Sequence, residues 1–223
     1  MKILFDTANL TVLEQLVPLY PVAGVTTNPT ILANEGRIDV YEHLRQLRRI
    51  IGPERSLHIQ VLAPDADGIV ADAHRLLEEV DDQVFVKVPT TEQGLRAIRL
   101  LKDEGVRVTA TAIYSKVQGM LAIAAGADYL APYFNRMESQ GVDARATVGS
   151  LAQFAERHGA ACTVMVASFK NLAQISDAFD AGAPAVTVPP ALLREALTAP
   201  AVTQAVAAFS QDWSDAFGTT QLP

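Results

Sequence analysis

A lysine inside an apolar run is the residue whose position most suggests chemistry. The run is Gln83-Val84-Phe85-Val86-Lys87-Val88-Pro89, and four of its seven residues are Val or Phe, which is typical of a strand buried in a parallel sheet. An ammonium group in an apolar wall must find a partner or lose its proton, so its pKa falls. A neutral amine attacks carbonyl carbons, so Lys87 is a candidate for Schiff-base formation. The alternative is that the strand ends before Lys87 and its stem carries the ammonium group to solvent.

Other polar side chains stand near the ends of further apolar runs, about one in each. They are Asp6, Asn28, Gln60, Thr111, Tyr133 and Ser168, with Arg136 just beyond the sixth run. Most lie in otherwise apolar surroundings, where a lone polar side chain needs a partner. Taken singly, each has a structural explanation: Asp6 or Asn28 as a cap, Thr111 as a strand former. Tyr133 alone would fit a core aromatic residue with a solvated hydroxyl. Their joint occurrence around a lysine borne on a strand predicts a site.

The chemistry of this set is coherent. A neutral Lys87 amine would attack a ketone to give a carbinolamine and, after loss of water, an iminium. The cationic nitrogen withdraws electrons from the adjacent carbon–carbon bond, which can then cleave and leave an enamine. Tyr133, Thr111 and Gln60 are candidates to hold and polarise a water for the proton transfers.

The remaining candidates would bind substrate. Asp6 would position hydroxyl groups or take part in proton transfer, and Asn28 would hold a hydroxyl. Arg136, together with Ser168 just before a helix expected to start at Phe169-Lys170, would form an anion site from a guanidinium and free helix amides. A barrel that binds a phosphosugar without catalysis would need only Arg136 and Ser168, and Lys87 would then be dispensable.

An alternation of strand-like run, polar loop and helix-like segment repeats eight times. The expected strands are Lys2 to Thr7, Ala23 to Thr27, Leu57 to Leu62, Val84 to Pro89, Arg107 to Ile113, Tyr129 to Phe134, Cys162 to Ala167 and Ala185 to Val188. Thr90 with Gln93, and Ser115 with Gln118, fit the capping-box pattern of helix starts. The pattern predicts a closed parallel (β/α)8 TIM barrel that forms one domain over residues 1–223. A doubly wound open sheet is the alternative, without a Gly-x-Gly-x-x-Gly turn to support it.

An extra helix is expected over residues 200–217, after the eighth unit. Pro200 suits its first turn, and one face carries Val202, Val206, Phe209, Trp213 and Phe217. This apolar stripe either covers the chain's own barrel or docks on a neighbouring subunit, because an exposed stripe of this size would promote aggregation.

Composition narrows the class of protein. The 223 residues are 49% hydrophobic with a formal charge of −7, which argues against nucleic-acid binding, since that requires a concentrated basic face. The cluster Arg45, Arg48 and Arg49 is expected to be a solvated helix face. The lone Cys162 excludes an intrachain disulfide, and we expect a cytoplasmic protein with no signal peptide and no bilayer span. The four histidines are dispersed, so no metal site is expected.

With these residues assembled, the sequence resembles the transaldolase family of class I aldolases, and most closely its small members of the fructose-6-phosphate aldolase type. The resemblance runs from Leu4-Phe5-Asp6-Thr7-Ala8 to Asp212-Trp213. It is carried by Ala23-Gly24-Val25-Thr26-Thr27-Asn28-Pro29-Thr30, Val86-Lys87-Val88-Pro89-Thr90, Ala125-Gly126-Ala127-Asp128-Tyr129 and Ala167-Ser168-Phe169-Lys170.

The resemblance implies a (β/α)8 barrel, a Schiff base at Lys87, no metal and no organic cofactor. It also implies a homo-oligomer of paired pentamers in which the terminal helix reaches a neighbour. Gln60 and Tyr133 match the aldolase type, whereas transaldolases usually carry Glu and Phe there. The expected reaction is therefore reversible cleavage of fructose 6-phosphate to dihydroxyacetone and glyceraldehyde 3-phosphate, with transaldolase activity as the alternative. A ketose with another anionic head, such as a sulfonate, would satisfy the same anion site.

Overall fold

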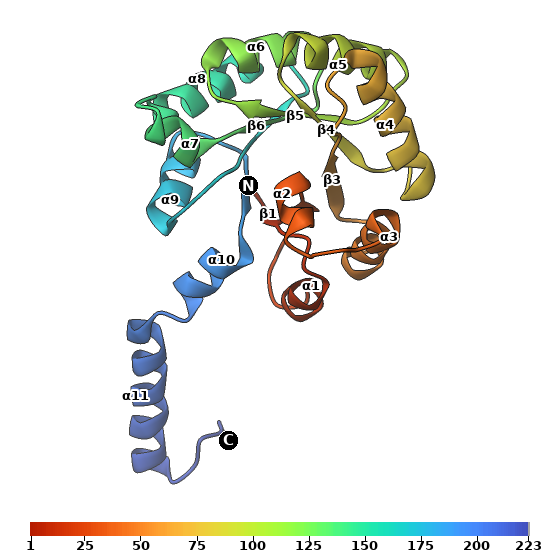
Figure 1. The fold of residues 1–223 in the computed structure, drawn as a ribbon. Helices are drawn as coiled ribbons and strands as arrows, with labels where there is room; N and C mark the ends of the chain where they lie inside the picture. Colours follow the sequence, from red (N-terminus) through yellow and green to blue (C-terminus); the bar gives the residue numbers. More distant parts are fainter. Residues whose placement is uncertain (223) are drawn as a thin grey trace. The chain divides into compact units, whose positions relative to one another are not determined.

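Eight parallel strands close into a barrel in chain order, with helices around it (Figure 1). The computed structural model describes residues 1–222. The strands are β1 (Lys2–Asp6), β2 (Gly24–Thr26), β3 (Ser56–Gln60), β4 (Phe85–Pro89), β5 (Val108–Ile113), β6 (Tyr129–Pro132), β7 (Thr163–Val166) and β8 (Ala185–Val188). The pairing of β1 with β8 completes the ring. The predicted barrel is therefore confirmed, although several strands are shorter than the apolar runs that predicted them.

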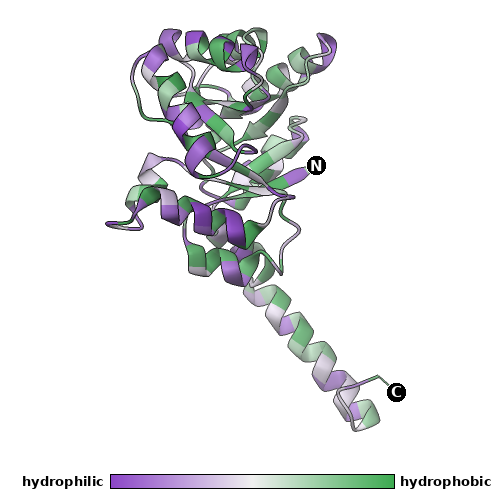
Figure 2. Ribbon diagram, turned by 90° about the vertical axis from the view of Figure 1, so that its right-hand side faces the viewer, coloured by the Kyte–Doolittle hydropathy of each residue, from purple (hydrophilic) through white to green (hydrophobic). Residues whose placement is uncertain are grey.

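Helices follow the strands as expected. They are α1 (Leu10–Leu16), α2 (Pro29–Ala33), α3 (Val40–Ile51), α4 (Ala66–Glu79), α5 (Glu92–Asp103), α6 (Lys116–Ala124), α7 (Phe134–Ser139), α8 (Ala144–Arg157), α9 (Leu172–Asp180), α10 (Pro190–Leu197) and α11 (Pro200–Phe217). Hydrophilic and hydrophobic residues alternate along them (Figure 2), because one face packs on the sheet and the other meets water.

Helix starts are set by local hydrogen bonds. Ser115 caps α6 as predicted, accepting a bond from the Gln118 amide. The cap of α5 is Thr91, whose hydroxyl accepts from the Gly94 amide, so the prediction of Thr90 as the cap was wrong by one residue. The Thr90 hydroxyl instead donates to the Thr111 carbonyl, which links the end of one strand to the next.

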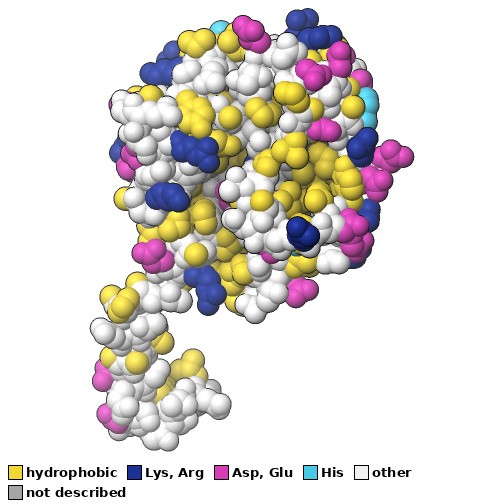
Figure 3. Space-filling view, in the orientation of Figure 1, with side chains coloured by type: hydrophobic (Ala, Val, Ile, Leu, Met, Phe, Trp, Pro, Cys, Tyr) yellow, Lys and Arg dark blue, Asp and Glu magenta, His cyan; other side chains and the backbone are white. Residues whose placement is uncertain are grey.

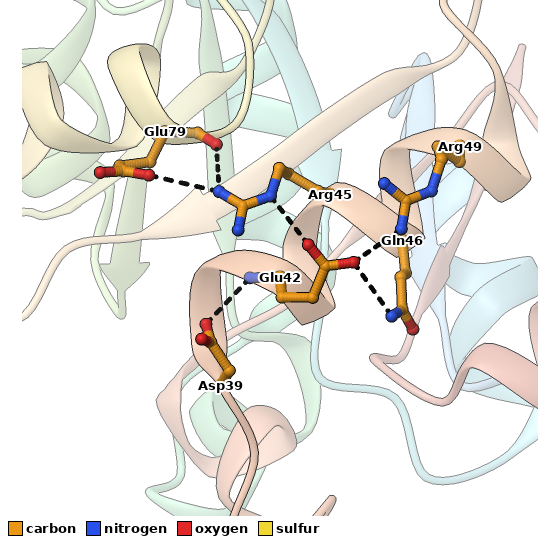
Figure 4. Close-up of polar contacts among 6 residues, drawn as sticks. All are labelled: Asp39, Glu42, Arg45, Gln46, Arg49 and Glu79. Carbon is orange, nitrogen blue, oxygen red and sulfur yellow. Dashed lines mark hydrogen bonds and ion pairs between the residues drawn. The ribbon is translucent and has the colours of Figure 1, made fainter.

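The arginines of α3 form ion pairs. Arg45 bonds Glu42 of its own helix and Glu79 of α4, and Arg49 bonds the other oxygen of Glu42 (Figure 4). Arg48 pairs with Asp81. Arg45 and Arg49 are thus on a solvated face as predicted, and their exposed pairs contribute little to stability. For Arg48 the prediction was wrong, because its pair with Asp81 is largely buried.

The chain divides into two compact units, Met1–Pro190 and a second unit from Ala191 onward. The second unit contains α11, with the bounds that the sequence predicted. Val202, Val206, Phe209 and Phe217 are each at least 45% exposed, and apolar side chains are visible on this helix in Figure 3. Among the described helices, none has the length and apolarity needed to cross a bilayer.

The barrel interior is packed from all sides. Leu4, Tyr129, Met165 and Ala185 come from four different strands and form one buried cluster, against which Phe85 packs. Because strand side chains alternate between faces, the residue two positions after each of these points into the same interior. This periodicity turns Asp6 inward above Leu4, and it turns Lys87 inward above Phe85.

Candidate active site

Lys87 lies inside the barrel and not at its surface. It is the third residue of β4 and only 4% of its side chain surface is exposed. Its Nζ donates a 2.7 Å hydrogen bond to the carbonyl oxygen of Thr27. The alternative in which the strand ends before Lys87 and the ammonium group reaches solvent is therefore wrong.

Burial lowers the pKa of Lys87, because the apolar surroundings disfavour the charged amine, while the negative charge of Asp6 opposes this effect. Burial likewise raises the pKa of Asp6, with the charge of Lys87 and a hydrogen bond from Thr26 opposing it. Burial thus disfavours the charged form of both groups, and their pKa values move toward each other. Perturbed pKa values of this kind cluster at functional sites.

Asp6 is fixed by a chain of threonine hydroxyls. Asp6 is the last residue of β1, and its Oδ1 accepts a 2.7 Å bond from the Thr26 hydroxyl. Thr26 also lies 2.6 Å from the Thr187 hydroxyl. Thr26 of β2, itself bonded to Thr187 of β8, thus fixes one oxygen of the carboxyl group. Within residues 1–222, the second oxygen has no hydrogen-bond partner and is a candidate contact for a ligand.

Thr111 and Tyr133 form the second pair of the site. Their hydroxyl groups are 3.0 Å apart, and burial raises the pKa of the Tyr133 phenol, so it stays protonated as a donor. The register of β5 against β6 shifts between Ala110 and Ile113, and Ala112 has φ of +55°. Such bulges are common beside active sites, where they re-aim a side chain. Here the irregularity directly follows Thr111.

Gln60 stands beside Lys87. The two are paired residues of β3 and β4, so their side chains leave the sheet on the same face. Within the part of the chain that the structure describes, the buried Oε1 of Gln60 has no hydrogen-bond partner. A buried acceptor in this state costs free energy unless water or a ligand bonds it, which makes it an attachment point for a water next to the amine.

Asn28 holds the loop after β2. Its Oδ1 accepts a 3.0 Å bond from the Ile31 amide and caps α2. The cap leaves the amide NH₂ available for a ligand hydroxyl. Both interpretations of Asn28 from the sequence are therefore compatible with its position. The neighbouring Thr27 carbonyl that receives Lys87 brings the start of this loop to the amine.

Arg136 and Ser168 lie at the rim. Ser168 has φ of +66°, a strained conformation for a residue with a side chain. Its carbonyl accepts a 2.9 Å bond from the Asn135 amide, next to Arg136. The helix expected to start at Phe169-Lys170 begins instead at Leu172, capped by Asn171. Ser168 therefore belongs to the loop before α9. Its positive φ is incompatible with a right-handed helix at that residue.

Tyr114 is a site residue that sequence reasoning missed. Its hydroxyl accepts a 3.2 Å bond from Arg136 Nη1, and its ring meets that of Tyr133 edge-on at 5.6 Å. The Arg136 guanidinium also lies 4.8 Å from the centre of the Tyr133 ring. Contacts between residues 22 positions apart leave no local signal in the sequence, so only the fold reveals them. Thr26 and Thr27 were missed as partners for the same reason.

The site thus combines a buried amine, a carboxyl group that competes with it, an unpartnered amide oxygen, two linked hydroxyls and a guanidinium at the rim. Within residues 1–222, no three His, Cys, Asp or Glu side chains gather closely enough to hold a metal ion. The inward groups stand near the carboxyl ends of the strands, where TIM-barrel enzymes carry their chemistry.

Comparison with known proteins identifies the family. The family model described as transaldolase/fructose-6-phosphate aldolase matches residues 3–220. A protein from Streptococcus pneumoniae described as a probable fructose-6-phosphate aldolase is 45% identical over 213 residues, which is 96% of each chain. The barrel and the two matches lead to one conclusion: this chain belongs to the transaldolase/fructose-6-phosphate aldolase family of enzymes.

Proposed function

We propose that this chain is a class I aldolase that reversibly cleaves fructose 6-phosphate to dihydroxyacetone and glyceraldehyde 3-phosphate, with Lys87 as the Schiff-base residue. The observation that carries the proposal is the burial of Lys87, which lowers the pKa of its amine, beside an acid whose pKa is raised. The 45% identity to a probable fructose-6-phosphate aldolase supports the choice of substrate.

In this mechanism the neutral Lys87 amine attacks the ketone carbon, and the carbinolamine loses water to give an iminium. The bond between the third and fourth carbons of the sugar then breaks as its electrons move toward the iminium nitrogen. The fourth-carbon hydroxyl loses its proton and leaves as the aldehyde of glyceraldehyde 3-phosphate. Asp6 is our candidate acceptor for that proton, because its raised pKa makes it a base that can also return a proton.

The fate of the enamine separates an aldolase from a transaldolase. A water bonded to the free Oε1 of Gln60 and to the linked hydroxyls of Tyr133 and Thr111 would protonate the enamine carbon. Hydrolysis of the resulting iminium releases dihydroxyacetone and restores the amine. In the alternative, a transaldolase, the enamine persists until an aldose phosphate accepts it.

The anionic head group would bind at Arg136 and Ser168. The guanidinium of Arg136 is exposed and anchored by Tyr114 and Tyr133, and a fixed guanidinium suits a phosphate. A sulfonate would meet the same groups. The anion site therefore supports an anionic head group on the substrate, and we propose a sugar phosphate as the physiological substrate.

We also propose that the chain is a cytoplasmic homo-oligomer, built from pentamers, in which α11 of one subunit packs on a neighbour. The support is the exposure of four large apolar side chains on one 18-residue helix, since a free surface of this kind favours association. Size-exclusion chromatography with light scattering would test the assembly, with a chain ending at Thr198 as the comparison. A monomer for the full chain would contradict it.

The reaction itself is tested by incubating the protein with fructose 6-phosphate, with and without erythrose 4-phosphate, while a coupled assay follows glyceraldehyde 3-phosphate. We expect sustained release without the acceptor. Release only with the acceptor would identify a transaldolase and show that Gln60 and Tyr133 do not decide the outcome. Lys87→Met is the control: it should abolish both reactions, and turnover that survives it would contradict the mechanism.

A further inference from the structure

A hollow lies at the amino end of the barrel, opposite the strand ends that carry the candidate active site. Its volume is about 710 Å³, and several of its lining residues stand where strands begin. Lys2, Ser56, Phe85 and Tyr129 are the first residues of β1, β3, β4 and β6, and Arg107 directly precedes β5. Parallel strands all start at one end of a barrel, so this amino-end cavity is the mouth away from the carboxyl ends.

Packed rings separate the amino-end cavity from Lys87. Phe85 and Tyr129 meet edge-on with centres 5.1 Å apart, and the His58 ring stacks on Phe85 at 4.6 Å. His58 is fully buried. A ligand in the amino-end cavity would therefore touch neither Lys87 nor the groups around it.

Cationic side chains outnumber carboxylates in the wall of this cavity. Lys2, Arg55 and Arg107 line it, against one carboxylate, that of Glu54. Among residues 1–222, none of the three cations has a carboxylate within ion-pair distance. Three cations against one carboxylate create a positive potential in a concave site, in a chain whose formal charge is −7.

Lys2 and Arg107 are exposed, and each makes one side-chain hydrogen bond within the described residues, so further donors are available to a ligand. Lys2 Nζ donates to the Tyr129 hydroxyl at 3.2 Å, which leaves its other hydrogens and the phenol proton available. Arg107 lies with its guanidinium 5.6 Å from the Phe85 ring centre and makes one long bond, 3.4 Å, to the Gln83 carbonyl.

A purely structural role explains only part of this set. Arg55 donates to the carbonyls of Val22 and Ile51, so it serves the loops at the strand starts. Lys2 and Arg107 do not bind loop carbonyls to the same extent. Lys2 bonds the Tyr129 phenol, and Arg107 mainly packs on the Phe85 ring. Their charges therefore remain available to a ligand.

We propose that the amino-end cavity binds a small metabolite bearing two phosphate groups, at a site separate from that of the substrate. Lys2 with Tyr129 receives one group, and Arg107 receives the other. The volume of about 710 Å³ exceeds what one phosphate would fill, and charge-assisted hydrogen bonds are the strong kind.

The test is calorimetric titration of the full chain with pyrophosphate at low ionic strength. The Arg136→Gln variant is used, which removes the guanidinium of the other candidate anion site. We expect saturation at one pyrophosphate per chain. Lys2→Gln with Arg107→Gln, added to this variant, should weaken binding about tenfold or more, since each removes a charge-assisted contact.

The matched control is Arg75→Gln with Arg99→Gln, two exposed arginines outside the cavity wall. It makes the same change in net charge and should alter affinity less than about twofold, because exposed distant charges are screened. Should the cavity double variant fail to fold, Arg107→Gln alone should still weaken binding about threefold. Absence of saturable binding, or equal weakening by the cavity and control variants, would overturn the proposal.

Discussion

His58 and Gln60 lie two residues apart on β3 and face the same interior, yet they differ in what their polar atoms do. His58 bonds Thr109 at 2.8 Å and Ser56 at 3.0 Å, so both of its ring nitrogens are satisfied. The Oε1 of Gln60 is buried with no partner in the described chain. His58 therefore has no bonding capacity left for a ligand, whereas Gln60 does. Burial is common to the polar atoms of both and does not by itself distinguish a candidate site residue.

The same contrast separates two layers of the barrel. The lower layer, around His58, Phe85 and Tyr129, is closed by packed rings, and both ring nitrogens of His58 have hydroxyl partners. The upper layer holds Lys87 and Asp6, whose protonation is perturbed by burial and by each other. Substitutions in the lower layer should therefore change stability, whereas those in the upper layer should change turnover.

The largest effect should come from Lys87→Met. Turnover of fructose 6-phosphate should be lost, because Lys87 is the only buried lysine among the residues that the structure describes. The melting temperature should stay level or rise, since the variant removes a desolvated amine and keeps the side-chain volume. Kinetics and thermal unfolding of the same preparation check this, and Lys116→Met on exposed α6 is the control. A large loss of stability would place Lys87 among structural residues.

Asp6→Asn should change the pH profile. The Asp6 charge raises the pKa of Lys87, while burial lowers it. Removing the charge lets the pKa of Lys87 fall further, so the increase of kcat/KM with rising pH should occur at lower pH. Maximal turnover should decrease about 10²-fold or more, because the proton transfer is lost. Rates between pH 5 and 10 measure both. An unshifted profile would show that the two groups do not interact.

Tyr114→Phe should produce a smaller and selective effect. The variant removes the oxygen that holds Arg136 Nη1, so KM for glyceraldehyde 3-phosphate in the synthetic direction should rise about threefold to tenfold. KM for unphosphorylated glyceraldehyde should not change. Tyr20→Phe, at the edge of Phe5, is the matched control. Equal changes for both aldehydes would mean that Tyr114 acts on the reacting carbons and not on the head group.

His58→Phe should have the smallest effect on turnover. The ring stack can persist, but Thr109 and Ser56 lose their bonds, which costs about 1–3 kcal/mol at pH 8. Burial, and then the charges of Lys87, Lys2 and Arg48, lower the pKa of His58 well below its usual value of about 6.5.

The lowered pKa of His58 makes the stability of the folded protein depend on pH. Below about pH 6.5, His58 binds a proton in the unfolded chain but not in the folded chain. The free energy of unfolding of the wild type therefore falls as the pH drops below about 6.5. The stability gap between the wild type and His58→Phe should therefore narrow from pH 8 to pH 5 in denaturant titrations. A constant gap would show that His58 protonates freely in the fold.

The number and order of strands were predictable because apolar runs and caps recur with a regular spacing. The boundaries of the elements were less predictable. Thr91 caps α5 in place of the predicted Thr90, whose hydroxyl donates to the Thr111 carbonyl instead. Positive φ at Ala112 and Ser168 had no signal, because both residues ordinarily avoid that region.

Candidate site residues were predictable one by one from their types at strand ends, but their partners were not. The bond from Lys87 to the Thr27 carbonyl spans 60 positions, and that from Arg136 to Tyr114 spans 22. Such contacts depend on barrel closure and register. The roles of the eight candidates stay predictions until they are tested by substitution.

Trapping the covalent intermediate would test whether Lys87 forms the Schiff base. The protein is incubated with fructose 6-phosphate and borohydride, digested, and examined by peptide mass spectrometry. We predict a reduced sugar adduct on Lys87 in the wild type and none in Lys87→Met. Turnover without any adduct, or an adduct on another lysine such as Lys170, would contradict the account.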